Sequence, residues 1–403
     1  MNSSKANTNL ALAKVAFGLC FAVWSLIAPL APQFQKSLGL SDTQISVLLA
    51  VPVILGSLVR IPMGILTDRF GGRRVFTGLI VFSILPVVFM GFANSYAMML
   101  VGGFFLGMAG SSFAVGVPFS SRWFSSERQG AALGIYGAGN IGTAIASYSV
   151  PWIAANYGTQ YAFWVFAPVL AVYAVVFWFL AEDAPNSRKS TTLSQNFQVV
   201  QKERLSWVFS LFYFVTFGGF VAFSLYLPKL LVDWFAFSKT DAGFRTAGFV
   251  VLATAARPIG GYLADRVGGA RLLALVFGVA PLLALVLAYE AISPEIVGVT
   301  IACLTLAILF GIGNGSVFKL VAQYFPKNTG IVTGVVGAAG GLGGFFPPIV
   351  MGLVRDATGS YSIGLVLLAV FLVGCLAVDY VGLIKNQPGT SQERASSPRR
   401  SAA

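Results

Sequence analysis

Apolar runs long enough to cross a lipid bilayer recur along the whole chain. They are separated by short breaks that carry Gly, Pro, Asp or Arg. About 20 apolar residues in a helix span the hydrocarbon core of a membrane, so each run predicts one membrane-spanning helix. The twelve predicted spans are 10–35, 44–66, 74–94, 97–120, 129–154, 160–181, 205–232, 240–264, 271–290, 296–321, 328–354 and 361–384.

One polar break is longer than the others and divides the spans into two groups of six. Residues 182–204 are predicted to form a cytoplasmic linker between an N-terminal six-helix bundle, 1–181, and a C-terminal six-helix bundle, 205–384. The polar tail, 385–403, is predicted to be disordered. The expected fold class is therefore an all-α integral membrane protein with two six-helix bundles.

Composition and charge agree with this class. Hydrophobic residues make up 57% of the 403 positions and charged residues only 10%, whereas an ordinary soluble protein has about 25% charged residues. Of the 26 Lys and Arg residues, eighteen fall in the predicted termini and even-numbered loops, and the positive-inside rule then places both termini in the cytoplasm. The net charge of +12 is thus mainly a topology signal, and we expect no nucleic-acid partner.

The remaining eight basic residues lie elsewhere. Five are assigned to the outer side: Lys36, Lys229, Lys239, Arg245 and Arg355. Three lie within predicted spans: Arg60, Arg257 and Lys319. Lys319 is placed toward the cytoplasmic end of its span, where it either attracts an exiting anion or extends its amine to the interface, and we favour the second interpretation.

The two groups of spans repeat each other. The segment Arg60–Arg74 matches Arg257–Arg271 at an offset of 197, with Arg, Gly, Leu, Asp, Arg, Gly, Gly and Arg in common. Two further pairs of spans match at offsets of 199 and 200. Parallel six-helix repeats place a binding site near the middle of the membrane, between the two halves.

Arg60 and Arg257 lie where a charge is unfavourable. Each is eight residues before the Asp at the cytoplasmic end of its span, which is about 12 Å along a helix and thus near the middle of the membrane. A charge there costs roughly 2.5–3.5 kcal/mol, so each arginine calls for a role. The sequence offers no Asp or Glu at that depth, and a planar guanidinium suits a planar oxyanion. The pair therefore predicts a site that clamps a small, flat anion.

Two glycine-rich segments lie in the fifth and eleventh spans, and their spacing predicts close helix packing around a narrow centre. Their glycines are Gly134, Gly137, Gly139 and Gly142 in one span and Gly334, Gly337, Gly340 and Gly341 in the other. Asn140 is a polar exception in this stripe. Its amide either donates to the anion or bonds a neighbouring helix.

The loop from Gly64 to Arg74 resembles the loop 2–3 signature of the major facilitator superfamily, and the glycine segments resemble the nitrate signatures of its NarK/NasA-type nitrate/nitrite porters. This resemblance implies two bundles that rock around a central site, with the glycine-rich helices sliding or bending. It also implies a cytoplasmic latch formed by Asp68, Arg69, Asp265 and Arg266. The substrate-binding residues that it implies are Arg60, Arg257, Asn140, Tyr213, Phe113 and Phe217.

The resemblance predicts alternating-access transport of nitrate, nitrite or both by a monomer in the bacterial inner membrane. With no His in the chain and no acidic residue at mid-depth, nitrate/nitrite antiport is favoured slightly over proton-coupled symport. Two alternatives stay open: a carrier for another small anion, and a nitrate sensor that does not transport. We expect no enzyme, cofactor or metal site, since the sequence shows no metal-ligand cluster or nucleophile–base pair.

Overall fold

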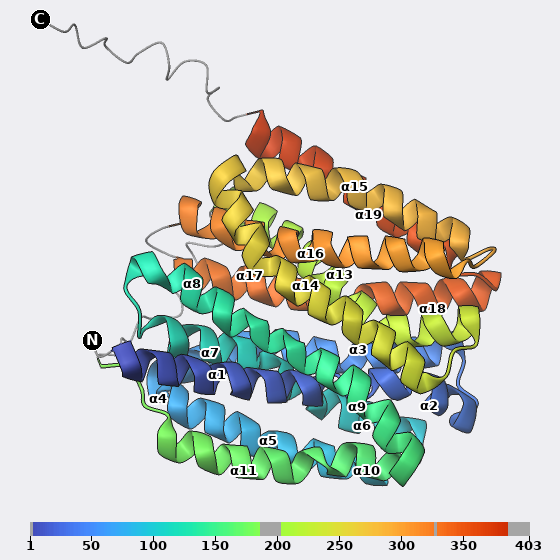
Figure 1. Cartoon of the computed structure of the whole chain (residues 1–403), viewed down its shortest axis with the longest axis horizontal. Helices are drawn as coiled ribbons and strands as arrows, with labels where there is room; N and C mark the ends of the chain where they lie inside the picture. The colour runs from blue at the N-terminus through green and yellow to red at the C-terminus, as the bar shows by residue number, and fades with distance from the viewer. Residues whose placement is uncertain (1–2, 186–202, 326–328, 386–403) are drawn as a thin grey trace, which may run out of the picture.

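The computed structural model describes residues 3–185, 203–325 and 329–385, and every regular element among them is a helix. We call residues 3–185 the N half and residues 203–385 the C half. In Figure 1 the N half, in blue to green, lies below the C half, in yellow to red, and the chain ends of both halves lie at the left. We call this the termini end and the opposite one the far end.

The N half contains α1 to α11. The bounds are α1 Ser3–Trp24, η1 Ala28–Leu30, α2 Ala31–Leu38, α3 Asp42–Leu58, α4 Arg60–Phe70, α5 Gly72–Phe92, α6 Tyr96–Leu106, η2 Gly107–Ser111, α7 Ser112–Ser121, α8 Ser126–Gly137, η3 Ala138–Asn140, α9 Ile141–Tyr157, α10 Thr159–Trp164 and α11 Phe166–Leu180.

The C half contains α13 to α19. The bounds are α13 Arg204–Phe235, α14 Lys239–Val267, α15 Gly269–Glu290, α16 Ile296–Tyr324, α17 Thr329–Gly343, α18 Phe346–Thr358, α19 Ser362–Asp379 and a final π-helical turn, η4, Tyr380–Ile384.

Eleven helical runs within these ranges are long and apolar enough to cross a membrane, and each overlaps one predicted span. The predicted span 129–154 is covered by α8, η3 and α9 but is not among the eleven, so the twelfth span stays a prediction. Most of the linker and all but the first residue of the tail lie outside the described residues, and the bundle boundaries likewise stay predictions.

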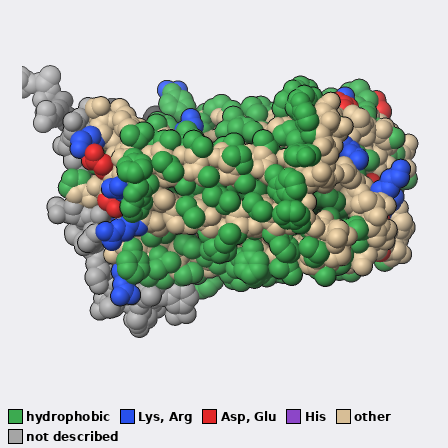
Figure 2. Space-filling view, turned by 90° about the horizontal axis from the view of Figure 1, so that it is seen from below, with side chains coloured by type: hydrophobic (Ala, Val, Ile, Leu, Met, Phe, Trp, Pro, Cys, Tyr) green, Lys and Arg blue, Asp and Glu red, His purple; other side chains and the backbone are tan. Residues whose placement is uncertain are grey.

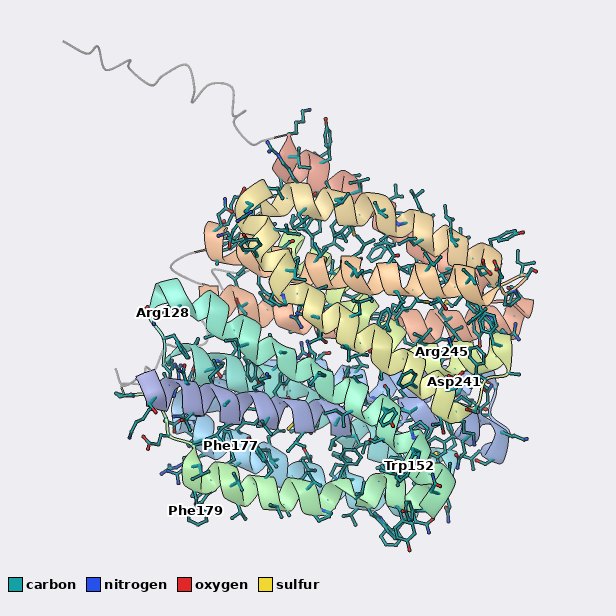
Figure 3. All side chains as sticks on the ribbon, in the orientation of Figure 1. Arg128, Trp152, Phe177, Phe179, Asp241 and Arg245 are labelled. Atoms are coloured by element: carbon teal, nitrogen blue, oxygen red, sulfur yellow. The ribbon has the colours of Figure 1, made fainter. Side chains whose placement is uncertain are left out.

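The surface agrees with a membrane environment. Figure 2 shows an apolar belt around the middle of the molecule, with the Lys, Arg, Asp and Glu side chains gathered at the two ends. Figure 3 shows Arg128 at the termini end and Asp241 and Arg245 at the far end. These positions agree with their assignment to opposite sides of the membrane.

The helix that carries Arg60 is broken where the arginine lies. The α-helix of α3 ends at Leu58, and α4 begins at Arg60. Pro62 has no N–H to donate to the carbonyl of Leu58, which explains the break. In the C half, α14 runs on through Pro258, directly after Arg257.

The two halves meet mainly through helices that reach the far end. There α9 of the N half packs against α14 of the C half, and α3 packs against α18 (Figure 1). At the first of these interfaces a Cβ on Gly243 would overlap the backbone carbonyl of Ser147, so the two backbones touch. The interface between the two halves is therefore closely packed at the far end.

Candidate anion-binding site

Arg60 and Arg257 occupy equivalent places in the two halves, on α4 and α14. Arg60 is only 5% exposed, and Arg257 is half-buried. Of the ion pairs found among the described residues, none includes either arginine. The centre thus holds two guanidinium groups without a carboxylate partner in the described part of the chain, as the sequence predicts.

Each guanidinium has one neutral partner and one free donor. Arg60 donates from Nη1 to the backbone carbonyl of Gly337, which belongs to the opposite half. Arg257 donates from Nη2 to the hydroxyl of Tyr213, 3.0 Å away. The Nε of Arg60 and the Nη1 of Arg257 are buried and make no hydrogen bond. A buried donor without a partner is unfavourable, so these two N–H groups are suited to receive an anion.

One aromatic ring lies against both arginines. The guanidinium carbons of Arg60 and Arg257 are 5.7 Å and 5.6 Å from the centre of the Phe217 ring. Phe113 covers Arg60 on another side, at 5.7 Å. Tyr213 stacks on Phe217 with ring centres 5.0 Å apart and planes inclined by 6°. The four predicted residues Arg60, Arg257, Tyr213 and Phe217 are therefore brought together, with Phe113 beside them.

Phe318 also belongs to this group of aromatic rings, and the sequence analysis did not single it out. The centre of its ring lies 4.7 Å from the ring centre of Tyr213, in an edge-on arrangement, and 6.4 Å from the ring centre of Phe113. It thus connects aromatic side chains of the two halves. A phenylalanine in an apolar span has no periodicity or polar neighbour that sets it apart from a core residue, so only the three-dimensional structure identifies it.

Asn140 is buried next to the site, but no contact joins it to either arginine. It is 1% exposed and ends η3, and both atoms of its amide lack a hydrogen-bond partner. Asn140, Thr143 and Ser147 follow one another at helical spacing, and Ser147 abuts α14. Asn140 therefore belongs to the face of the N half that is turned toward α14.

The eight glycines fall into three groups. A Cβ would overlap a neighbour at four of them: Gly139 against Phe17, Gly142 against the backbone of Gly18, Gly340 against Tyr213 and Gly341 against Ser57. At Gly337 a Cβ would make an ordinary contact, 3.6 Å from Phe113. At Gly134, Gly137 and Gly334 it would meet nothing within 4 Å. Close packing thus accounts for half of the stripe. Of the last three positions, Gly134 and Gly334 are exposed, and Gly137 is buried with open space beside it.

The two latch loops are held within their own halves. Asp68 accepts a hydrogen bond from Arg122, and Asp265 forms an ion pair with Lys319. Arg122 and Lys319 are themselves 197 residues apart, the offset of the repeat. The Lys319 side chain is 40% exposed and its amine pairs with a carboxylate of the neighbouring helix, and the choice between the two interpretations of Lys319 stays a prediction. Arg69 and Arg266 lie over the rings of Phe70 and Tyr262.

A buried charge cluster at the far end joins the two halves, and the sequence analysis missed it. Lys229 of α13 is 1% exposed and pairs with Asp42 of α3 at 2.8 Å and with Asp233 of its own helix. Asp356 of α18 accepts the backbone N–H groups of Asp42 and Thr43 at 3.0 Å and 2.8 Å. The assignment of Lys229 to the outer side stays a prediction, and its burial between carboxylates of both halves is a feature that the sequence analysis did not include. The carboxylate four residues later was the available signal.

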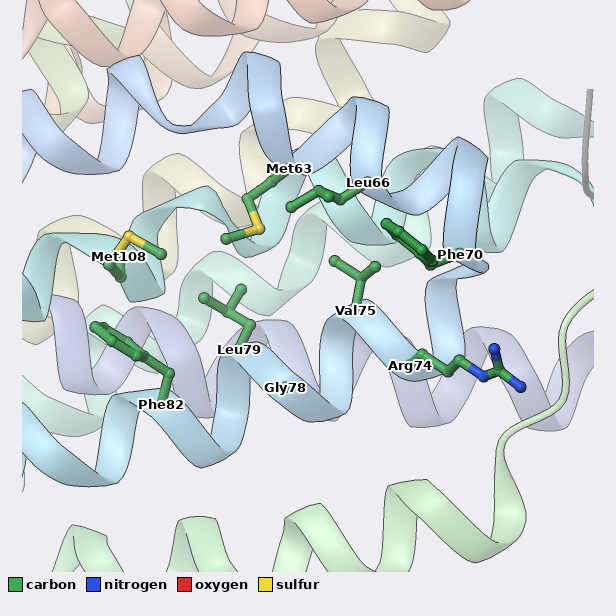
Figure 4. Close-up of a pocket in the computed structure, with 9 residues that line it drawn as sticks. All are labelled: Met63, Leu66, Phe70, Arg74, Val75, Gly78, Leu79, Phe82 and Met108. Atoms are coloured by element: carbon green, nitrogen blue, oxygen red, sulfur yellow. The ribbon is translucent and has the colours of Figure 1, made fainter. Parts of the chain in front are cut away.

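An apolar groove on the outer face of the N half lies apart from this site. Figure 4 shows it between α4 and α5, with Arg74 at its open end. Its other lining residues are Met63, Leu66, Phe70, Val75, Gly78, Leu79, Phe82 and Met108. Such a surface suits lipid chains rather than a small anion, so we do not assign it to the substrate.

The family model of the Major Facilitator Superfamily matches residues 15–348. The nitrite extrusion protein of Bacillus subtilis is 42% identical over 366 residues, which cover 91% of this chain and 92% of that protein. The probable nitrate/nitrite transporter NarK2 of Mycobacterium tuberculosis is 40% identical over 387 residues, which cover 94% and 97%.

Among solved structures, a bacterial homologue of the human lysosomal transporter Spinster, in an inward-facing and unoccupied conformation, has a TM-score of 0.76. It is 15% identical and the match covers 97% of this chain and 100% of that one, so this likeness concerns the fold alone. Together these findings identify a multi-pass transporter of the plasma membrane rather than an enzyme. The chain belongs to the major facilitator superfamily and, within it, to the NarK-type nitrate/nitrite porter family.

Proposed function

We propose that this protein carries nitrate, nitrite or both across the bacterial plasma membrane, with the anion held between Arg60 and Arg257. The observation that carries the proposal is the placement of these two arginines, one from each half, against the same aromatic ring. They come from equivalent helices of the two halves, share the ring of Phe217 and have no ion-pair partner among the described residues. An anion supplies the charge that both guanidinium groups lack.

The chemistry of the site favours a small, flat oxyanion. Each guanidinium keeps one buried N–H without a partner, and aromatic rings from both halves form the walls. A planar fork of N–H donors matches the oxygens of a planar anion, and the low polarity of the walls strengthens those hydrogen bonds. The names of the relatives, nitrite extrusion protein and nitrate/nitrite transporter, agree with this class of substrate.

The same geometry suggests how binding couples to alternating access. Arg60 reaches across the interface to the Gly337 carbonyl, so a bound anion competes with a bond that joins the two halves. Two cations facing each other repel, and an anion between them removes that repulsion and allows the site to close. In this scheme both termini are cytoplasmic, the far end faces outward, the glycine-rich helices rock and the latch loops control the cytoplasmic side.

The composition of the chain also bears on how transport is coupled to a second ion. The chain contains no His, the usual side chain that exchanges a proton near neutral pH. We therefore favour exchange of nitrate for nitrite over proton symport. An exchanger needs nitrite on the opposite side and leaves the internal pH unchanged, whereas a symporter acidifies the vesicle interior.

The test is anion flux into proteoliposomes made with the purified protein. We expect nitrate and nitrite uptake in the unaltered protein and loss of both after Arg60→Ala or Arg257→Ala. Arg245→Ala is the matched control, because Arg245 lies on the same helix as Arg257 but is exposed and paired with Asp241. Unchanged flux in the two site variants would disprove the assignment. Inhibition by formate or acetate as strong as by nitrite would instead indicate another small anion, and binding without flux would indicate a sensor.

A further inference from the structure

Thr254 carries a hydroxyl group that the fold leaves without a partner. In a membrane-spanning helix, a Ser or Thr hydroxyl commonly donates to the backbone carbonyl one turn earlier. Thr246 of α14 does this, with Ala242 as its acceptor at 2.8 Å. Thr254 lies on the same helix and is 7% exposed, but its Oγ1 is buried and forms no hydrogen bond. A buried hydroxyl in this condition is unfavourable, which points to a partner outside the helix.

The position of Thr254 places it beside the anion site. It lies three residues before Arg257, so the two side chains share a helix face and are separated by about 4.5 Å along the axis. It also follows Gly243 by eleven residues, close to three full turns, and Gly243 abuts the backbone of α9. Thr254 is therefore directed both toward the arginine and toward the N half.

The surface of the N half that faces α14 also carries buried polar side chains without hydrogen-bond partners. Asn140 and Thr143 lie on the side of η3 and α9 that is turned toward α14, and α14 contacts both elements. Asn140 and Thr143 are each 1% exposed, and neither side chain has a hydrogen-bond partner. Three unpartnered polar side chains thus face one interface between the halves, next to the free N–H of Arg257.

The internal repeat provides a comparison within the same chain. The equivalent of Thr254 at the offset of 197 is Ser57, one turn before Arg60. Ser57 donates to the backbone carbonyl of Val53 at 2.7 Å, and it packs against Gly341. Its hydroxyl is thus already used. At these two equivalent positions, the C half offers a spare donor and the N half does not.

We propose that Thr254 is a third anion-binding side chain and that it sets the preference between nitrate and nitrite. The inference rests on the proposed transport function and deepens it. The two arginines engage two oxygens of the anion, and the hydroxyl of Thr254 donates to the third oxygen, which nitrate has and nitrite lacks. Thr254 therefore stabilises bound nitrate more than bound nitrite.

The test compares Thr254→Val, which keeps the shape and removes the donor, with Thr254→Ser, which keeps the donor. Half-saturating concentrations for nitrate and nitrite are measured separately in proteoliposomes. Loss of a hydrogen bond to a charged acceptor corresponds to roughly tenfold or more, so we expect about a tenfold rise for nitrate in the Val variant. We expect little change for nitrite, and near-normal values for both anions in the Ser variant.

Ser57→Ala is the matched control, because it removes the equivalent hydroxyl from the other half, and we expect it to leave both anions unaffected. Thr254→Ala repeats the test if the Val variant is poorly folded by size-exclusion chromatography. Equal changes for nitrate and nitrite, or none, would overturn the role of Thr254 while the transport function stands. A wild-type protein that moves neither anion would refute the transport function and this inference together.

Discussion

We predict that replacing Lys229 makes the two halves separate more readily at the far end. Its ammonium group is 1% exposed and lies between the carboxylates of Asp42, in the N half, and Asp233, in the C half, whose side chains are each 20% exposed. In Lys229→Met the length of the side chain is kept and the charge is lost. The two carboxylates then face each other across the contact between the halves, and the cation that remains nearby is Arg355, which is 33% exposed and whose Nε lies 3.7 Å from Asp42.

The magnitude follows from this burial. Removing one partner of a buried ion pair costs about 3–5 kcal/mol, because the remaining charge is left uncompensated. The carboxylates keep some contact with water and Asp42 keeps Arg355 as a partner at 3.7 Å, so we take the lower value, about 3 kcal/mol. Since the carboxylates become hydrated when the far end opens, this energy shifts the equilibrium toward the open state. At about 1.4 kcal/mol per factor of ten, the shift exceeds 100-fold.

The assay is the rate at which a cysteine at the interface reacts with a maleimide. Ser46 suits this purpose, because it is 0% exposed and its hydroxyl bonds Tyr226 of the other half at 3.1 Å. In nanodiscs, with the native Cys20, Cys303 and Cys375 replaced by alanine, Ser46→Cys should react slowly. It should react much faster when Lys229→Met is added.

Lys239→Met is the control for this experiment. Lys239 also lies at the far end and also bonds the N half, through Gln33 at 3.0 Å, but it is exposed and its contact contributes little. We expect no change in labelling in that variant. An unchanged labelling rate in Lys229→Met would refute the reasoning, and a lower melting temperature at constant labelling would make the cluster a purely structural element.

Three further predictions concern packing, the aromatic wall and the latch. Gly142→Ala should lower the unfolding free energy by about 1–3 kcal/mol, because a Cβ at this position overlaps a backbone carbonyl. Gly137→Ala should be tolerated, because Gly137 has open space around it, and thermal unfolding in detergent distinguishes the two variants. Phe217→Ala should weaken anion binding about tenfold by removing a ring that contacts both arginines, and Phe217→Tyr should retain it in the same flux assay. Lys319→Met should change stability by less than about 1 kcal/mol, since Lys319 and Asp265 are 40% and 54% exposed; a loss of several kcal/mol would contradict this.

The sequence was sufficient for the course of the helices and for the central arginines. Eleven of the twelve predicted spans coincide with helical runs long enough to cross a membrane. The exception, 129–154, is covered by α8, η3 and α9, and a run of glycines with Asn140 among them gives a weaker apolar signal. The hydrogen bond from Arg60 to the backbone carbonyl of Gly337 was not foreseeable, because every residue has a backbone carbonyl and the sequence does not distinguish one from another.

The contrast between Arg257 and Lys229 shows which functional charges a sequence reveals. Both are basic residues on long helices of the C half. Arg257 lies near the middle of a span, where a charge is unfavourable in any fold, so its presence alone indicated a role. Lys229 lies near the end of a span, where a lysine commonly extends its amine to water, and its burial results only from the approach of Asp42 in the other half. Depth in the membrane can be read from one helix, whereas burial between two halves depends on both. The residues that we propose to bind the anion are for this reason visible in the sequence, and residues that hold the halves together are visible only in the structure.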